Sequence, residues 1–146
     1  MKVLITGATG YVGGRLLERL LEKDVQVRVL VRDADRAASR SWSDQVEIVE
    51  ADLLDRASLR RALDGVDVAY YLVHSMCAGD DFADVDRTAA RNFVAEGRHL
   101  RQVIYLGGIA PEGDHRSRSQ HLSSRNEVGE ILREGLPTTE LRAGPI

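Results

Sequence analysis

The sequence predicts an α/β fold in which helices cover both faces of a parallel sheet. Runs of β-branched and other apolar residues alternate along the chain with segments of helical period. The first apolar run, at residues 3–6, enters a glycine-rich turn, and an amphipathic helical pattern follows that turn at once. Strands and helices in this alternation form right-handed crossovers between parallel strands. We therefore expect a doubly wound sheet with strand order 3-2-1-4-5-6.

Each expected element has its own local pattern. Strands are expected at the β-branched or apolar runs, residues 3–6, 25–31, 46–51, 66–73, 102–106 and 138–143. Helices are expected between them, at residues 11–23, 55–63, 80–99 and 119–134, with a short helix or loop at 33–43. Asp55 is a favourable N-cap for the helix that follows it, and Gly65 is a favourable stop. We expect one domain over residues 1–146, since a chain near this length buries roughly 68–70% of its unfolded surface.

Net charge and cysteine content narrow the class of protein. The chain carries 20 basic and 23 acidic residues, so its formal net charge is −3. That balance gives no reason to expect a nucleic-acid or membrane partner, and the apolar runs are too short to span a bilayer. Cys77 is the only cysteine, which excludes an internal disulfide and agrees with a cytoplasmic location. No metal site is expected, and the oligomeric state stays open.

The turn after the first strand carries three glycines, and each has a separate physical use. Gly7 allows the chain to turn sharply out of the strand. Gly10 allows backbone N–H groups to approach a diphosphate, and Gly13 allows the new helix to pack close to the sheet. The N-terminus of that helix carries a partial positive charge. The spacing is G-x-x-G-x-x-G rather than the G-x-G-x-x-G of the standard dinucleotide fingerprint, so a tight turn without a ligand is the alternative.

Residues 6–13, TGATGYVG, resemble the extended and atypical short-chain dehydrogenase/reductase families, which include NmrA-like and biliverdin-reductase-B-like proteins. The resemblance covers essentially the whole chain. It implies a Rossmann fold and an NAD(P) cofactor held at the glycine turn. Contacts to the cofactor are then expected from the three glycines and from Thr9, Tyr11 and Val12, which lie between or beside them.

The end of the second strand bears on the choice between NADP and NAD. Proteins selective for NAD place an acidic residue there to hold the ribose 2′-hydroxyl, whereas an arginine accommodates the 2′-phosphate of NADP. Here the strand ends at Arg32 and Asp33. The guanidinium fork suits a phosphate, so we expect NADP, with NAD possible if Asp33 reaches the ribose. The alternative for Arg32 is a solvated residue at a strand end.

Two further strand ends are expected at the same edge of the sheet, where ligands of open α/β sheets bind. Asp52 and Leu53 end the third strand, and the matching residues of the resembled family flank the adenine. Asp52 has an equally good alternative as a turn residue. Leu72, Val73 and His74 end the fourth strand, on the path toward the nicotinamide ribose. A lone histidine at a loop start is also often a surface residue.

The segment expected to carry catalysis departs from the pattern of the resembled family. Classical and extended short-chain dehydrogenases use Tyr-x-x-x-Lys on the helix after the fifth strand, and a hydroxyl near the end of that strand. Here the helix carries His121 and Arg125 at the same spacing, which allows both side chains to face one way. The fifth strand ends in Gly107 and Gly108 without a hydroxyl. His121 could act as a general acid or hydrogen-bond donor; the alternative is that both are exposed helix residues.

Three further strings are similar to a bacterial subgroup of larger NAD(P)H-binding oxidoreductase-like proteins: YLVHSM, YLGG and HLSSRNEVG, at residues 71–76, 105–108 and 121–129. Those proteins continue past the Rossmann core, so we expect this chain to be truncated after the sixth strand, without the substrate-binding region. The resemblance implies hydride transfer between NADP(H) and a small carbonyl or unsaturated substrate. The alternative, which the absent Tyr-x-x-x-Lys favours, is a non-catalytic dinucleotide-binding redox sensor of the NmrA type. Whether the protein is an enzyme therefore stays open.

Overall fold

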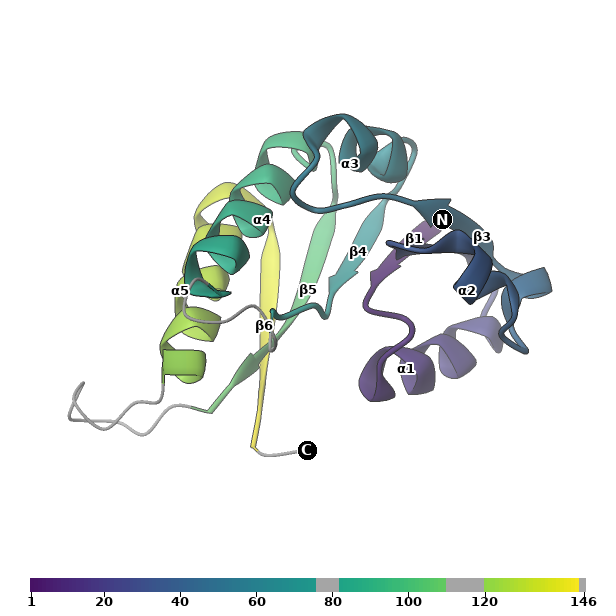
Figure 1. Cartoon of the computed structure of the whole chain (residues 1–146), viewed down its shortest axis with the longest axis horizontal. Coiled ribbons are helices and arrows are strands. Elements are labelled where there is room, and N and C mark those ends of the chain that lie inside the picture. Colours follow the sequence, from purple (N-terminus) through teal and green to yellow (C-terminus); the bar gives the residue numbers. More distant parts are fainter. Residues whose placement is uncertain (76–81, 110–119, 145–146) are drawn as a thin grey trace.

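The computed structural model describes residues 1–75, 82–109 and 120–144, with the side chains of residues 120 and 121 outside the described part. Its centre is a six-stranded sheet in the order β3-β2-β1-β4-β5-β6, and every neighbouring pair runs parallel (Figure 1). The strands are β1 (Lys2–Thr6), β2 (Gln26–Val31), β3 (Glu47–Glu50), β4 (Val68–Tyr71), β5 (Gln102–Gly108) and β6 (Thr138–Ala143). The expected fold class and strand order are confirmed.

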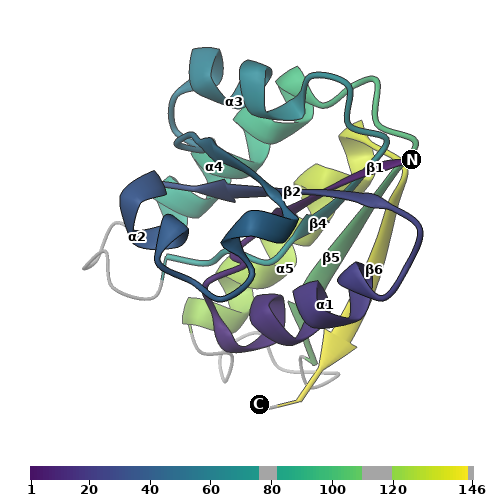
Figure 2. The same cartoon turned by 90° about the vertical axis from the view of Figure 1, so that its right-hand side faces the viewer.

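Helices lie on both faces of this sheet. They are α1 (Tyr11–Leu21), α2 (Ala34–Ala38), α3 (Arg56–Leu63), α4 (Phe82–Glu96) and α5 (Gln120–Gly135), with a short 3₁₀ turn at Ser43–Gln45. Helices α1 and α2 pack on one face, and α3, α4 and α5 pack on the other, as the two views in Figures 1 and 2 show. Among the described residues, no helix is long and apolar enough to cross a membrane.

The limits of the first three expected strands differ from the structure by one residue at one or both ends, and those of the fourth and fifth strands differ by two residues. The fourth strand was expected at 66–73 and spans only residues 68–71. Val66 donates instead to the Leu63 carbonyl in the turn after α3, and the Leu72 N–H leaves the ladder to donate to the Thr6 hydroxyl at 3.0 Å. The fifth strand was expected to end at 106, but it continues to Gly108, because Gly107 and Gly108 pair with the end of β6.

Each face of the sheet has its own apolar core. On the α3–α5 face, Tyr71, Phe93 and Tyr105 are fully buried, and the Tyr71 and Phe93 rings meet edge to face at 5.0 Å. On the other face, Ile5 and Leu17 are fully buried where α1 crosses the sheet. These two cores fix the positions of α1 and α5, the helices whose N-terminal regions lie near the carboxyl ends of the strands (Figure 1).

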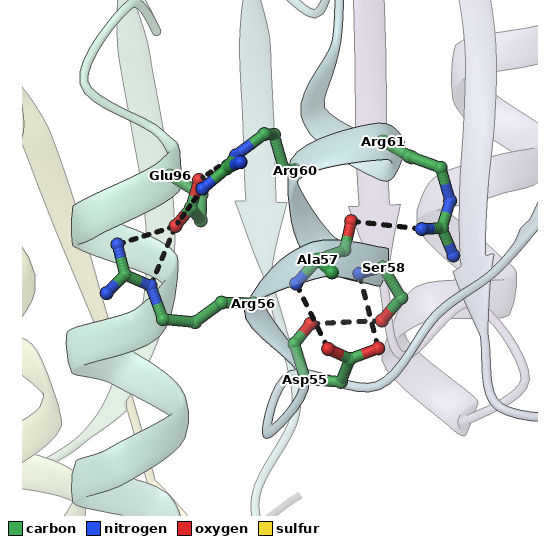
Figure 3. Close-up of polar contacts among 7 residues, drawn as sticks. All are labelled: Asp55, Arg56, Ala57, Ser58, Arg60, Arg61 and Glu96. Atoms are coloured by element: carbon green, nitrogen blue, oxygen red, sulfur yellow. Dashed lines mark hydrogen bonds and ion pairs between the residues drawn. The ribbon is translucent and has the colours of Figure 1, made fainter.

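Helices α3 and α4 are joined by a cluster of polar contacts that Figure 3 shows in detail. Asp55 caps α3, as expected, by accepting hydrogen bonds from the N–H groups of Ala57 at 3.0 Å and Ser58 at 3.3 Å. From the same helix, Arg56 and Arg60 both reach Glu96 at the end of α4, at 2.7 and 2.8 Å. The Glu96 side chain is only 5% exposed. This three-residue cluster holds α3 against α4.

Candidate functional site

A cavity of about 500 Å³ opens at the carboxyl edge of the sheet, between the start of α1 and the ends of β4 and β5. This is the point where the strand order reverses, because β2 lies on one side of β1 and β4 on the other. Ligands of doubly wound sheets bind at such a switch point. The cavity is lined by Gly7, Gly10, Tyr11, Val12, Gly13, Leu72, His74, Leu106, Gly107, Arg125 and Ala143.

The glycine turn shapes the α1 side of the cavity. Gly7 has φ +76°, a conformation that residues with a side chain rarely adopt. Gly13 lies so close to the turn that a Cβ there would be 2.1 Å from the Gly7 carbonyl oxygen. Only glycine is therefore compatible with the approach of α1 to the end of β1. Both roles match what the sequence predicted for these positions.

The start of α1 differs from the starts of the next two helices. Asp33 caps α2 and Asp55 caps α3, so their carboxylates occupy free N–H groups. Helix α1 begins instead at Gly10, with no side-chain cap and no acidic residue in its first turn. Because the first N–H groups of a helix have no partner within the helix, an uncapped start favours an anion. This start faces the cavity, and a phosphate group matches it chemically.

His74 lies on the opposite wall of the cavity, just past the end of β4. Its Nε2 is 3.4 Å from the Leu106 carbonyl oxygen, an acceptor that requires Nε2 to carry the proton. The other ring nitrogen, Nδ1, is buried and has no hydrogen-bond partner among the described residues. Burial, together with the Arg125 guanidinium, lowers the pKa of His74 to about 4. The ring is therefore neutral at neutral pH, with a free acceptor at Nδ1.

A buried carboxylate on α4 contacts both the loop that follows β4 and helix α5. Asp86 on α4 is 6% exposed, and it accepts hydrogen bonds from the Ser75 N–H at 2.9 Å and the Ser124 hydroxyl at 3.2 Å. Ser75 follows His74 in the chain, and Ser124 precedes Arg125 on α5. Asp86 thus connects the loop that carries His74 to the helix that carries Arg125.

Arg125 places a permanent positive charge in the cavity. Its side chain packs beside Gly108 at the end of β5, where a Cβ would lie 3.7 Å from the Arg125 Cδ and Nη1 atoms. The backbone of Arg125 is fixed by the Tyr105 hydroxyl, which donates to its carbonyl oxygen at 2.8 Å. The ion pairs formed within the described part of the chain engage Lys2 and other arginines, and none includes Arg125.

The structure brings many of the sequence-predicted site residues together. Those that line the cavity are Gly7, Gly10, Tyr11, Val12, Gly13, Leu72, His74 and Arg125. Three lining residues were not predicted: Leu106, Gly107 and Ala143. A signal for them was present, because the carboxyl ends of parallel strands meet at one edge. Applying that rule to β5 and β6 as well as to β3 and β4 would have found them.

Other predicted residues lie outside this cavity, among them Thr9 and Val73. Arg32 is exposed at the end of β2, and Asp33 accepts a hydrogen bond from the Arg36 N–H at 2.9 Å as the cap of α2. Asp52 accepts from the Leu54 N–H at 2.9 Å, the turn role that was its alternative.

Leu53 and His121 are not among the described residues that line the cavity. Leu53 is half-buried, packed against the core on the α3–α5 face. His121 belongs to α5, but its side chain is outside the described residues.

The comparison with known families agrees with this geometry. Residues 7–138 match the NAD(P)H-binding family, a span that includes the glycine turn and reaches the start of β6. The chain belongs to this family. Its fold is the NAD(P)-binding Rossmann fold, and its relatives include reductases.

Relatives with known activities are similar over nearly all of this chain. A (4-alkanoyl-5-oxo-2,5-dihydrofuran-3-yl)methyl phosphate reductase of Streptomyces griseus is 33% identical over 96% of this chain and 46% of its own length. The triphenylmethane reductase of Citrobacter sp., solved with NADP(H), is 26% identical, with a TM-score of 0.78 over 97% of this chain and 49% of that one.

A third relative was also solved with its cofactor. The NADPH-dependent quinone oxidoreductase of Escherichia coli, in complex with NADPH, is 26% identical, with a TM-score of 0.71 over 96% of this chain and 48% of that one. The chain therefore spans about half the length of these three relatives.

Proposed function

We propose that the chain binds NADP(H) at the glycine turn and belongs to a reductase that transfers hydride to a small carbonyl or unsaturated substrate. The observation that carries this proposal is the uncapped start of α1, which faces the cavity over a turn that only glycine can form. A diphosphate at this helix start receives backbone N–H donors and the positive end of the helix dipole. Gly10 leaves open the space that the phosphates need.

The cavity extends from the glycine turn toward His74 and Arg125, and this direction orients the cofactor. With the diphosphate at α1, the nicotinamide half lies toward the ends of β4 and β5, and the adenosine half toward the end of β2. The dihydronicotinamide, when bound, supplies the hydride. His74 just past the end of β4 and Arg125 on α5 would be the described polar side chains nearest to it, because both line the cavity.

We propose NADP rather than NAD as the cofactor. Arg32 is exposed at the end of β2, where a guanidinium can pair with a 2′-phosphate. Asp33 already uses one carboxylate oxygen to cap α2, which leaves it less suited to hold a ribose hydroxyl. NADP(H) and NADPH are also the cofactors named for two of the solved relatives. The cytoplasmic location stays a prediction.

The reaction class rests on the relatives together with the cavity. Their names describe reduction of a furanone phosphate, a triphenylmethane dye and a quinone. The assignment of His121 and Arg125 to catalysis stays a prediction. A dinucleotide-binding redox sensor is the second candidate, favoured by the absence of Tyr and Lys at those two positions.

One pair of measurements tests both candidates. Calorimetric titration of this chain with NADP⁺ and with NAD⁺ should give binding, tighter for NADP⁺. In the whole protein, NADPH oxidation is then followed with a panel of carbonyl and conjugated acceptors. Turnover with any acceptor supports the reductase. Tight cofactor binding without turnover supports the sensor, and absence of binding to either dinucleotide rejects both.

A further inference from the structure

The part of the cavity formed by the ends of β4, β5 and β6 and by α5 contains a cationic side chain, and its described residues include no acidic side chain. Among the described lining residues from β4, β5, β6 and α5, only His74 and Arg125 have polar side chains. His74 is neutral and directs its N–H toward the Leu106 carbonyl. Arg125 contributes a guanidinium, which is a hydrogen-bond donor and never an acceptor. Within the described residues, this part of the cavity is therefore suited to stabilise negative charge through Arg125.

The end of β5 gives the guanidinium its position. Gly107 lines the cavity, and Gly108 lies beside the Arg125 side chain. A Cβ at Gly108 would lie 2.9 Å from a methyl carbon of Leu122 and 3.7 Å from Arg125 Nη1. The strand thus has no side chain at Gly107 and Gly108, and the Arg125 side chain packs beside Gly108. The Tyr105 hydroxyl fixes the backbone of Arg125, and no ion pair within the described part of the chain engages its guanidinium.

We propose that Arg125 is the catalytic residue that holds the substrate oxygen on which negative charge develops, and that the substrate is a conjugated carbonyl compound. This inference rests on the proposed function, since it assumes a hydride donor in the cavity. A saturated ketone becomes an alkoxide, which needs a proton from a positioned acid. A conjugated acceptor becomes a resonance-stabilised enolate, which needs only electrostatic stabilisation.

Hydride transfer to a conjugated carbonyl compound moves three electron pairs. The hydride forms a new C–H bond at the β carbon of the acceptor, and the dihydronicotinamide that supplies it is oxidised by two electrons. The π pair of the C=C bond moves to form a double bond to the carbonyl carbon, and the carbonyl π pair moves onto oxygen. The resulting enolate oxygen is held by the Arg125 guanidinium. Water later supplies the proton to the α carbon.

A binding experiment tests the role of Arg125 without turnover. The probe is tetronate, a cyclic enolate that is anionic at neutral pH, titrated into the NADP⁺-saturated chain by calorimetry. γ-Butyrolactone, a neutral ring of similar size, is the matched ligand. We expect Arg125→Gln to weaken tetronate binding by roughly 10- to 100-fold, as for a lost charge-assisted hydrogen bond. The tetronate affinity of Arg125→Lys should lie between those of the parent and Arg125→Gln. The affinity for the lactone should be the same in all three proteins.

Controls keep this result separate from folding and from cofactor binding. Arg91→Gln removes an exposed arginine on α4 outside the cavity and should leave tetronate binding unchanged. Arg125→Gln should keep the parent's thermal unfolding midpoint and bind NADP⁺ within about threefold. Equal tetronate binding by the parent and Arg125→Gln overturns the proposal. A loss of NADP⁺ affinity as large as the loss of tetronate affinity also overturns it, because Arg125 would then serve the cofactor.

The substrate class is tested by a matched pair of acceptors in the whole protein. NADPH oxidation should proceed with cyclohexenone and be at least about tenfold slower with cyclohexanone, and Arg125→Gln should lower kcat for cyclohexenone. Equal rates with both ketones overturn the assignment.

If the parent binds no NADP⁺, the proposed function has failed; tetronate is then titrated into the protein alone. Arg125-dependent binding there supports the anion site, and Arg125-independent binding or no binding overturns it.

Discussion

A Cβ on Gly13 in helix α1 would lie 2.1 Å from the carbonyl oxygen of Gly7 at the end of β1. The same atom would lie 2.7 Å from the Gly7 carbonyl carbon. These contacts involve backbone on both sides, so no rotation of a flexible side chain can relieve them. The closeness of these two glycines brings the free N–H groups at the start of α1 to the edge of the cavity.

Gly13→Ala should therefore destabilise the fold. The helix must shift away from β1, and overpacking of this kind costs about 1–3 kcal/mol or more. Gly14→Ala is the matched control, because a Cβ there meets nothing nearer than the Ala8 carbonyl oxygen at 3.7 Å. That substitution should stabilise α1 by up to about 1 kcal/mol, the helix propensity difference. Urea denaturation of the two variants measures both effects, and equal midpoints would contradict the close approach.

Gly10→Val should abolish dinucleotide binding while the protein remains folded. Gly10 has φ −82°, which residues with side chains adopt, and the nearest atom to a Cβ there is the Gly7 oxygen at 3.3 Å. The side chain would extend instead into the space of the phosphates. Calorimetry with NADP⁺ checks binding, and circular dichroism checks the fold. Parent-like affinity would mean that the loop is only a turn.

Sequence alone predicted the features that depend on local pattern. The alternation of strand and helix runs determined the sheet order, and the uses of Gly7 and Gly13 followed from the turn that the chain must make. The neutral state of His74 could not be predicted, because it depends on burial against β5 and on Arg125, which is distant in sequence. The position of Arg125 beside Gly108 could not be predicted either, because the packing of α5 against β5 brings these residues together.

Arg32→Ala should weaken NADP⁺ binding more than NAD⁺ binding. A charge-assisted contact to a phosphate contributes roughly 1.5–3 kcal/mol, which corresponds to a loss of about 10- to 150-fold in affinity. Asp33→Asn is a useful comparison, because the amide oxygen can still accept the Arg36 N–H that caps α2. Calorimetric titration of each variant with both nucleotides measures the selectivity. Equal losses for the two nucleotides in Arg32→Ala would reject the 2′-phosphate assignment.

The imidazole of His74 should titrate near pH 4, well below the usual range of histidine. Burial is the main cause and the Arg125 guanidinium the second, while the Leu106 carbonyl and the Asp86 carboxylate oppose them. Arg125→Gln removes a cation, so the pKa of His74 should rise in that variant. Asp86→Asn removes an anion and should lower it further. Histidine ring resonances followed by NMR across the pH range report each shift, and a pKa unchanged by Arg125→Gln would place the guanidinium far from the ring.

The Arg56–Arg60–Glu96 cluster between α3 and α4 should make part of the stability depend on pH (Figure 3). Hydrogen bonds from Arg60 and Arg56 hold the pKa of Glu96 below its ordinary value of 4.5. The folded state therefore favours the ionised carboxyl, so the stabilisation is complete above that ordinary value and is lost as the pH falls through the lowered pKa.

Glu96→Gln should lower the Tm by a few degrees at pH 7, and this difference from the parent should vanish at acid pH. Glu134→Gln, at an exposed position of α5, serves as the control and should track the parent throughout. A Tm difference that stays constant from neutral to acid pH would show that Glu96 acts through packing rather than through its charge.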